Sequence, residues 1–489
     1  MSESTPPRLG TLASRGAAQT LSGQLARLVV QFTGVVLLAR LLAPTDYGLV
    51  AMVVSIIGIA EVVRDLGLSP AAVQAPTLSR QERDNLFWLN SALGAILTAA
   101  TVAVGPLIAQ LYDEPRLIAL TTALSAVFLL NGLSAQYRAG LSRELRMGSL
   151  AVADVAGAAS GLLAAVVVAF SGFGYWALAV QQLTQALVVL MIVVGAARWI
   201  PGGIHRRVTV RPFVRFGSGI LLTQLLTYAS RNVDSVVVGT AFGAQTLGTY
   251  NRAFELLMLP LNQLNAPASR VALPVLSKLQ ADHGRYGRFL LAGQTVLLQM
   301  ILAVFSFAIA LASPLVEIVL GLKWSAVVPI FEILAIGGVF QALTYVNYWV
   351  FMSRRLTRSM ITWSIVTRPL LIVAVVFGSL WGVEGVAMAF TVANIAFWPL
   401  SLLWFARDPV IPTLRLFWLA ARSLVVYSAV GIAAFSASMI ASGSPWGALL
   451  WGALGWLIAF GLSLLVPVCR RDANVVLTVL RNSVAKGDS

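Results

Sequence analysis

Arginines inside long apolar segments are the residues of this sequence whose chemistry stands out most. A charged side chain at the centre of a bilayer costs about 3 kcal/mol on insertion scales, so it normally faces water, a partner or a ligand. The planar guanidinium group binds phosphate oxygens through two parallel hydrogen bonds. We therefore predict an anion-binding role for five arginines that lie within apolar segments or at their edges: Arg27, Arg64, Arg231, Arg270 and Arg368.

Carboxylates at a similar depth leave two interpretations open. Glu61 lies three residues before Arg64, and Arg231 lies three residues before Asp234, so each pair can neutralise itself on one helix face. Alternatively, such carboxylates can bind and release protons and so couple transport to an ion gradient. On the second interpretation, Glu61, Asp234 and Glu255 are the candidate coupling residues.

The composition is that of a membrane protein. The chain has 489 residues, of which 58% are hydrophobic and 11% charged, and a soluble domain of this size cannot bury so much apolar surface. Apolar runs of about 20 residues recur along the chain, as membrane-spanning helices require. We therefore predict an all-α integral membrane protein with about 14 transmembrane helices. The predicted spans include 47–67, 116–136, 214–242 and 248–276, and the stretch 151–195, which is too long for one helix, is expected to divide at Gly172–Gly174.

Cysteine and histidine are too scarce for most metal or catalytic sites. The single cysteine, Cys469, excludes a disulfide framework, and both histidines, His205 and His283, lie in predicted loops. We expect no catalytic residue, no metal and no cofactor. The polar, proline-containing stretch from Met1 to Gly16 has no apolar core, so we also expect no signal peptide.

The net charge of +15 would indicate a nucleic-acid partner in a soluble protein. In a membrane protein, lysine and arginine collect in cytoplasmic loops and set the orientation. Most basic residues fall on one side of the predicted spans, for example Arg143, Arg146, Arg206 and Arg207. We therefore expect no nucleic acid, and we expect both termini to be cytoplasmic.

Fourteen spans divide into two sets of six and a final pair. The predicted domains are an N-terminal segment at 1–17, a first lobe at 18–198, a cytoplasmic linker at 199–213 with a flexible WIPGGIHRR stretch, a second lobe at 214–405, two further spans at 406–467 and a cytoplasmic C-terminus at 468–489. Six spans in each lobe give both lobes the same orientation, as in two-lobed alternating-access carriers.

An internal repeat supports this division. Residues 37–53 read LLARLLAPTDYGLVAMV, and residues 237–254 read VVGTAFGAQTLGTYNRAF, so that Gly48 corresponds to Gly248 and Ala43 to Gly243. Each copy predicts two apolar helices joined by a short hairpin, with a buried arginine in the first helix of each pair.

Several ordered stretches resemble a known family. They are LLARLLAPTDYGLVAMV, YRAGLSRELRM, GFGYWALAVQQL, RNVDSVVVG, LGTYNRAFELLMLP and LPVLSKLQ. Together they resemble the polysaccharide transporter branch of the multidrug/oligosaccharidyl-lipid/polysaccharide exporter superfamily, and within it the colanic-acid-exporter-like flippases. The similarity runs from about Arg15 to Arg407.

The resemblance implies two six-helix lobes in a V around a central cleft. It implies that undecaprenyl-diphosphate-linked oligosaccharide is flipped from the inner to the outer leaflet of the bacterial inner membrane. Relatives that flip peptidoglycan precursor use cleft arginines on spans 1, 2 and 8, which here contain Arg27, Arg64 and Arg270. The expected partners are this lipid-linked substrate, membrane lipid, and a glycan polymerase or glycosyltransferases of the same pathway.

Two rival functions remain open from the sequence. A multidrug cation antiporter of the same superfamily would be expected to have an acid-rich cleft, whereas here arginines at depth match or outnumber carboxylates. A membrane glycan polymerase usually needs a large outer loop, and the predicted outer loops are short. Both features favour the transporter of an anionic lipid.

Overall fold

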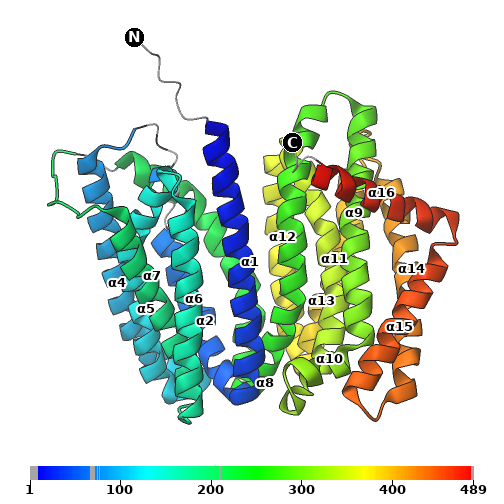
Figure 1. Ribbon diagram of the computed structural model, residues 1–489, viewed down its shortest axis with the longest axis horizontal. Helices are drawn as coiled ribbons and strands as arrows, with labels where there is room; N and C mark the ends of the chain where they lie inside the picture. Colours follow the sequence, from blue (N-terminus) through cyan, green and yellow to red (C-terminus); the bar gives the residue numbers. More distant parts are fainter. Residues whose placement is uncertain (1–8, 66–71, 74, 76, 209–210, 486–489) are drawn as a thin grey trace. The chain divides into compact units, whose positions relative to one another are not determined.

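The computed structural model describes residues 9–65, 72–73, 75, 77–208 and 211–485, which are almost entirely helical (Figure 1). They form two compact units, Met1–Gly248 and Thr249–Ser489, and the boundary falls inside helix α8. The all-α membrane fold predicted from the composition is confirmed. The predicted lobes, 18–198 and 214–405, follow the sequence repeat rather than the packing, and that division stays a prediction.

The first unit is a bundle of long helices joined by short turns (Figure 1). The stretch 151–195 splits at a turn in which Gly172 and Gly174 both have positive φ, as its length predicted. Close packing of the two helices on either side depends on Gly161, where an added Cβ would lie 2.7 Å from the carbonyl oxygen of Gln181. The unit contains α1 (Leu9–Leu41), α2 (Pro44–Asp65), α4 (Arg80–Tyr112), α5 (Arg116–Arg143), α6 (Met147–Phe170), α7 (Trp176–Ala197) and the first half of α8 (Arg211–Leu279).

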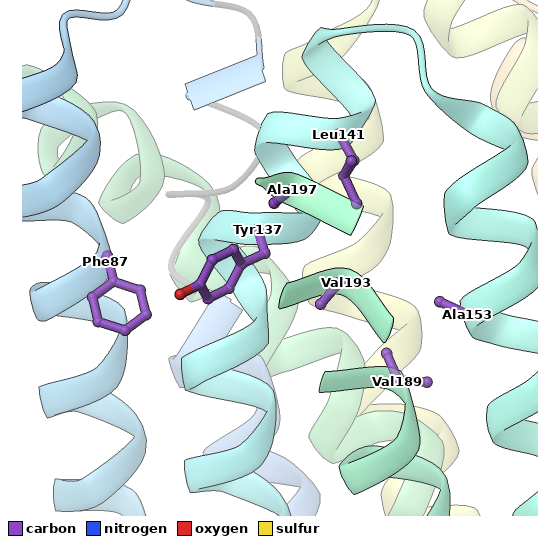
Figure 2. Close-up of a cluster of buried hydrophobic side chains, with 7 residues drawn as sticks. All are labelled: Phe87, Tyr137, Leu141, Ala153, Val189, Val193 and Ala197. Atoms are coloured by element: carbon purple, nitrogen blue, oxygen red, sulfur yellow. The ribbon is translucent and has the colours of Figure 1, made fainter. Parts of the chain in front are cut away.

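A buried cluster ties four helices of this unit together (Figure 2). Phe87 and Tyr137 meet edge to face with their ring centroids 5.7 Å apart, and small aliphatic side chains of α6 and α7 complete the cluster. Its members are Phe87, Tyr137, Leu141, Ala153, Val189, Val193 and Ala197. Two members of the cluster, Tyr137 and Ala153, are the immediate neighbours in sequence of Arg138 and Asp154, so the cluster fixes the positions of these two polar residues on α5 and α6.

The linker between the predicted lobes is hydrogen-bonded to α4 at several points. The side-chain amide of Asn85 on α4 donates to the carbonyl oxygens of His205 and Val208, at 2.9 and 3.0 Å. Its oxygen accepts a hydrogen bond from the backbone N–H of His205, and the indole of Trp88 donates to the carbonyl of Gly202. These contacts join parts of the linker to α4, and the flexibility of the WIPGGIHRR stretch stays a prediction.

In the described part of the chain, the second unit consists of the second half of α8 and eight further α-helices. It contains α9 (His283–Ala310), α10 (Ala312–Val319), α11 (Val327–Ser353), α12 (Thr357–Gly378), α13 (Gly382–Phe405), α14 (Thr413–Ser438), α15 (Pro445–Ser463) and α16 (Pro467–Ala485). Buried polar contacts fasten these helices to one another. The amide of Asn347 on α11 donates to the hydroxyl of Ser401 on α13 at 2.6 Å, for example.

Most membrane-spanning helices of the structure agree with the spans predicted from the sequence. Among the described residues, eleven segments are long and apolar enough to cross a membrane, and one of these, Thr357–Phe405, holds both α12 and α13. The two halves of α8 correspond to the predicted spans 214–242 and 248–276, although α8 is not among the eleven. The end of the second predicted span, at residue 67, lies outside the described residues. No helix was predicted within 468–489, where the structure has α16, because only apolar runs were counted there.

The two copies of the repeat differ in how their helices join. In the first copy α1 ends at Leu41 and α2 begins at Pro44, so the predicted hairpin is present. In the second copy α8 consists of two helices that meet at Gly243, whose dihedral angles are not helical (φ 78°, ψ −178°). The two predicted helices are therefore present in this copy too, and one glycine with positive φ makes the break between them.

Candidate functional site

A polar cavity of about 870 Å³ lies among α1, α2, α5, α6 and α7 of the first unit. Its charged lining consists of Arg27, Glu61, Arg64, Arg138 and Asp154. Three amide side chains, those of Asn131, Gln182 and Gln185, add neutral donors and acceptors to the wall. Because the helices around it are apolar enough to cross a membrane, this cavity is a polar pocket in an otherwise hydrophobic bundle.

Helical periodicity places these residues on one wall. On α5, Asn131, Ser134, Arg138 and Ser142 recur every three or four residues, which puts them on a single helix face. Arg64 lies in the last turn of α2, and Asp154 lies two turns into α6. The cavity is therefore lined near one end of the bundle, where α2 and α5 end and α6 begins.

Arg138 and Asp154 form a two-pronged ion pair across neighbouring helices. The guanidinium nitrogen Nη1 lies 2.7 Å from Oδ1, and Nη2 lies 3.3 Å from Oδ2. Both side chains are partly exposed, at 37% and 27%. Arg138 was not among the predicted site residues, because it lies just after the predicted span 116–136. Its signal in the sequence was Asp154, the single acid within 151–195, sixteen positions further along the chain.

Glu61 on α2 is paired with Arg64, as the first of the two interpretations of these carboxylates expects. Nη1 of Arg64 lies 3.3 Å from Oε1 of Glu61, one helical turn earlier, and the Glu61 side chain is the more exposed of the two. The Arg64 side chain is 13% exposed and that of Glu61 54%, so water reaches the carboxylate and weakens this single contact. Its arginine can thus exchange a carboxylate for another anion at small cost.

Arg27 differs from the other two arginines of the cavity. It is half-buried, and it makes no ion pair with any other described residue. The cavity lining therefore holds three guanidinium groups and two carboxylates, an excess of one positive charge. An anion of one or two charges fits this balance better than a cation does.

The remaining predicted residues lie away from this cavity. Arg231 is exposed, so the prediction that it is buried was wrong, and it does not belong to the salt bridges found among the described residues. Asp234 is buried, and its Oδ1 accepts a hydrogen bond from the backbone N–H of Ser235. The substrate role predicted for Arg231 and the coupling role predicted for Asp234 stay predictions.

Three further predicted residues belong to the second unit. Arg270 and Arg368 are both exposed on their helices. Glu255 forms an ion pair with the buried Arg252 one turn earlier, as in the pairing alternative raised for the other acids. Among the described residues, no group of three or more histidine, cysteine, aspartate or glutamate side chains is close enough to hold a metal ion.

Solved structures of two kinds of transporter share this fold. The structure of a lipid II flippase, MurJ, in an inward closed conformation superimposes with a TM-score of 0.69 and 15% identity, covering 92% of this chain and 100% of that chain. An inward-facing multidrug resistance MATE family transporter gives a TM-score of 0.61, also at 15% identity, covering 83% and 99%. At this identity the likeness establishes the fold alone.

Curated relatives come from surface-polysaccharide biosynthesis. The chain is 25% identical over 379 residues to the lipopolysaccharide biosynthesis protein WzxC of Escherichia coli, covering 75% of each chain. It is 25% identical over 349 residues to the teichuronic acid biosynthesis protein TuaB of Bacillus subtilis, covering 69% of this chain and 71% of TuaB. It is 23% identical over 348 residues to the succinoglycan biosynthesis transport protein ExoT of Rhizobium meliloti, covering 70% of each.

Residues 37–329 match a family described as "Polysaccharide biosynthesis protein". The matched segment is more than half of the chain, and it includes the polar cavity apart from Arg27. This multi-pass membrane protein therefore belongs to the polysaccharide biosynthesis protein family, a family of transporters rather than of enzymes.

Proposed function

We propose that the protein flips a lipid-linked oligosaccharide across the bacterial inner membrane and that the polar cavity of the first unit holds its diphosphate. The observation that carries this proposal is the convergence of Arg27, Arg64 and Arg138 on one cavity inside a bundle of membrane helices. The names of all three relatives refer to the biosynthesis of a polysaccharide, and that of ExoT also refers to transport, which supports a glycan as the transported substrate.

The cavity chemistry suits both ends of such a headgroup. Guanidinium groups bind phosphate oxygens through paired, charge-assisted hydrogen bonds. The amides of Asn131, Gln182 and Gln185 offer the mixture of donors and acceptors that sugar hydroxyls need. The polyprenyl tail requires no protein site, because it can stay in the bilayer throughout.

In our proposal, the diphosphate exchanges with internal carboxylates. Asp154 occupies the fork of Arg138, and Glu61 contacts Arg64, so each arginine holds a carboxylate in the position of a phosphate. The entering diphosphate takes over these arginines and also binds Arg27, which has no ion-pair partner among the described residues. The released carboxylates are then free to bind protons, which gives Glu61 its proposed coupling role.

Transport itself is proposed to follow alternating access. Arg231, Arg270 and Arg368 are part of this proposal as further cationic positions for the headgroup, and Asp234 and Glu255 as further coupling positions. The glycan polymerase or glycosyltransferases of the pathway are the proposed partners, with both termini of the chain in the cytoplasm.

Cation antiport is the second candidate, since MATE transporters share the fold. The excess of arginine over carboxylate in the cavity disfavours it, because a cation would be repelled there. A binding measurement separates the two functions. Purified protein is titrated with undecaprenyl diphosphate-linked saccharide and, separately, with a lipophilic cation such as ethidium.

We expect saturable binding of the diphosphate lipid that weakens in Arg27→Gln and Arg138→Gln, and no saturable binding of ethidium. Arg285→Gln, which removes an exposed arginine paired with Asp282 in the second unit, is the matched control and should bind normally. Saturable ethidium binding without diphosphate-lipid binding would refute the proposal.

A further inference from the structure

The start of α16 forms a second concave, cationic surface, far along the chain from the cavity of the first unit. α16 begins at Pro467, shortly after the membrane span α15 ends at Ser463. In Figure 1 α16 runs across the ends of the upright helices of its own unit. A helix that follows a membrane span and runs across the ends of the spanning helices lies at the boundary between hydrocarbon and water.

One face of α16 is fixed to the helix bundle by charge. Nη2 of Arg422 on α14 lies 2.7 and 2.6 Å from the two carboxylate oxygens of Asp472. Asp472 is buried, with 7% of its surface exposed. This contact gives Arg422, within the membrane span α14, an acidic partner on α16. It also determines which face of α16 turns outward.

The outward face is hollowed and basic. A cavity of about 530 Å³ is lined by Leu465, Pro467, Arg470, Arg471, Asn474, Val475 and Thr478, which we call the α16 groove. Arg470 and Arg471 are both exposed, and neither forms an ion pair with another described residue. Two guanidinium groups beside an amide and a hydroxyl provide many hydrogen-bond donors for a phosphate.

The local electrostatics call for an external anion. Arg470 and Arg471 are the fourth and fifth residues of α16, close to the positive end of the helix dipole, where a basic side chain is unfavourable. The first turn contains no acid, and the next acid, Asp472, is paired with Arg422. The positive charge of Arg470 and Arg471 is therefore not balanced by an ion pair with any described residue.

Apolar side chains accompany the arginines at this corner. Leu465 is 77% exposed and Val466 49% exposed, at the junction of α15 and α16. Such residues are unfavourable in water but suited to the upper part of the acyl chains. Exposed aliphatic side chains next to guanidinium groups match a phospholipid, which has acyl chains next to an anionic phosphate. They do not match a free soluble anion, which has no apolar part.

We propose that the α16 groove binds the phosphate of an anionic phospholipid in the surrounding membrane. Arg470 and Arg471 bind the phosphate oxygens, Asn474 donates from the side, and Leu465 contacts the first carbons of the acyl chains. The Arg422–Asp472 ion pair holds the groove at the membrane surface. This inference does not depend on the function proposed for the first unit.

Thermal unfolding of the full-length protein in detergent tests the proposal. Phosphatidylglycerol, phosphatidylcholine and inorganic phosphate are titrated separately into the wild type and into the double variant R470Q/R471Q. The matched control is R206Q/R207Q, which removes the same charge from two adjacent exposed arginines of the linker. Melting temperature without added lipid shows whether each variant is folded.

We expect phosphatidylglycerol to raise the melting temperature of the wild type and of R206Q/R207Q in a saturable way. The rise should be less than half as large in R470Q/R471Q, and phosphatidylcholine should have little effect on any variant. An equal loss in both double variants would show a general charge effect and overturn the site. A full response to inorganic phosphate alone would show a free-anion site and overturn the lipid assignment.

A second variant keeps the proposal testable if R470Q/R471Q does not fold. Asn474→Trp fills the groove without changing any charge. A smaller phosphatidylglycerol response in this variant supports the groove as the binding site, and an unchanged response overturns it.

Discussion

Arg138 of α5 and Asp154 of α6 form a bidentate ion pair at the wall of the polar cavity, with Nη1 2.7 Å from Oδ1 and Nη2 3.3 Å from Oδ2. The two residues bracket the short connection between α5 and α6, so the turn itself brings them together. In this arrangement an internal carboxylate occupies the site that we assign to a phosphate. The pair therefore competes with substrate for the same guanidinium group.

Asp154→Asn should strengthen binding of a diphosphate lipid. The change frees Arg138 from its carboxylate, and partly exposed ion pairs of this kind contribute about 0.2–1 kcal/mol. We therefore expect an affinity gain of up to about fivefold, measured by equilibrium titration of the purified protein. Glu114→Gln, which breaks an exposed pair with Arg116 away from the cavity, should leave affinity unchanged. Weaker binding by Asp154→Asn would argue against the exchange.

Gly48→Ala should destabilise the protein. An added Cβ at Gly48 would collide with the carbonyl oxygen of Ala244, and one at Gly248 would collide with the carbonyl oxygen of Pro44. The two equivalent glycines of the repeat thus let the two copies touch through their backbones. Overpacking of this kind costs about 1–3 kcal/mol, seen as a lower melting temperature.

Gly195→Ala is the control for that substitution. Gly195 lies inside α7, and an added Cβ would meet no other atom within 4 Å. Alanine at a helix interior position is favoured over glycine by roughly 0.5–1 kcal/mol, so this variant should be as stable as the wild type or more so. Equal melting temperatures for Gly48→Ala and the wild type would contradict the close contact.

Asn85→Ala should release the linker. The change removes three hydrogen bonds that join α4 to the backbone of His205 and Val208. Trypsin should then cut faster after the exposed Arg206 and Arg207, which can be followed by electrophoresis and mass spectrometry of the fragments. Trp88→Phe removes a single hydrogen bond to the linker and should accelerate cleavage less. Equal cleavage rates in all three proteins would mean that these contacts do not hold the linker.

Cys469 should react slowly with iodoacetamide in the folded protein. Burial raises the pKa of this thiol, the Asp472 carboxylate adds to the increase, and the Arg422 guanidinium opposes it. The thiolate is the reactive form, so the folded protein holds less of it at any pH below the raised pKa.

We expect the alkylation rate of the folded protein to keep rising with pH above the usual thiol pKa of about 8.5, whereas the rate of the denatured protein levels off there. Because the chain has one cysteine, total label gives the rate directly. Identical pH profiles for folded and denatured protein would contradict this.

The helices were largely predictable from the sequence because membrane spans are long apolar runs. The turn at Gly172 and Gly174 was recognisable because 151–195 is too long for one helix. The break at Gly243 falls where the repeat predicted two helices to meet, although the repeat did not show that a single residue with positive φ makes the connection. Helix α16 was missed because its apolar residues are mixed with charges and never form a long run.

The candidate site was only partly predictable. Arg27 and Arg64 were identified from their depth in apolar segments, and both line the cavity. Arg138 was missed because the predicted span ended at residue 136, whereas α5 continues to Arg143. The amides of Gln182 and Gln185 gave no signal in the sequence, since their role depends on which face of α7 meets the cavity.

The central claim is tested most directly by translocation of undecaprenyl diphosphate-linked oligosaccharide in proteoliposomes. Wild type, Arg27→Ala and Arg285→Ala are compared at equal reconstituted amounts, with delivery to the far leaflet read by an impermeant lectin or glycosidase. Loss of hydrogen bonds to a charged group costs about 1.5–3 kcal/mol, so Arg27→Ala should slow transport by roughly ten- to a hundredfold while Arg285→Ala transports normally. Wild-type transport rates in a folded Arg27→Ala protein would contradict the account.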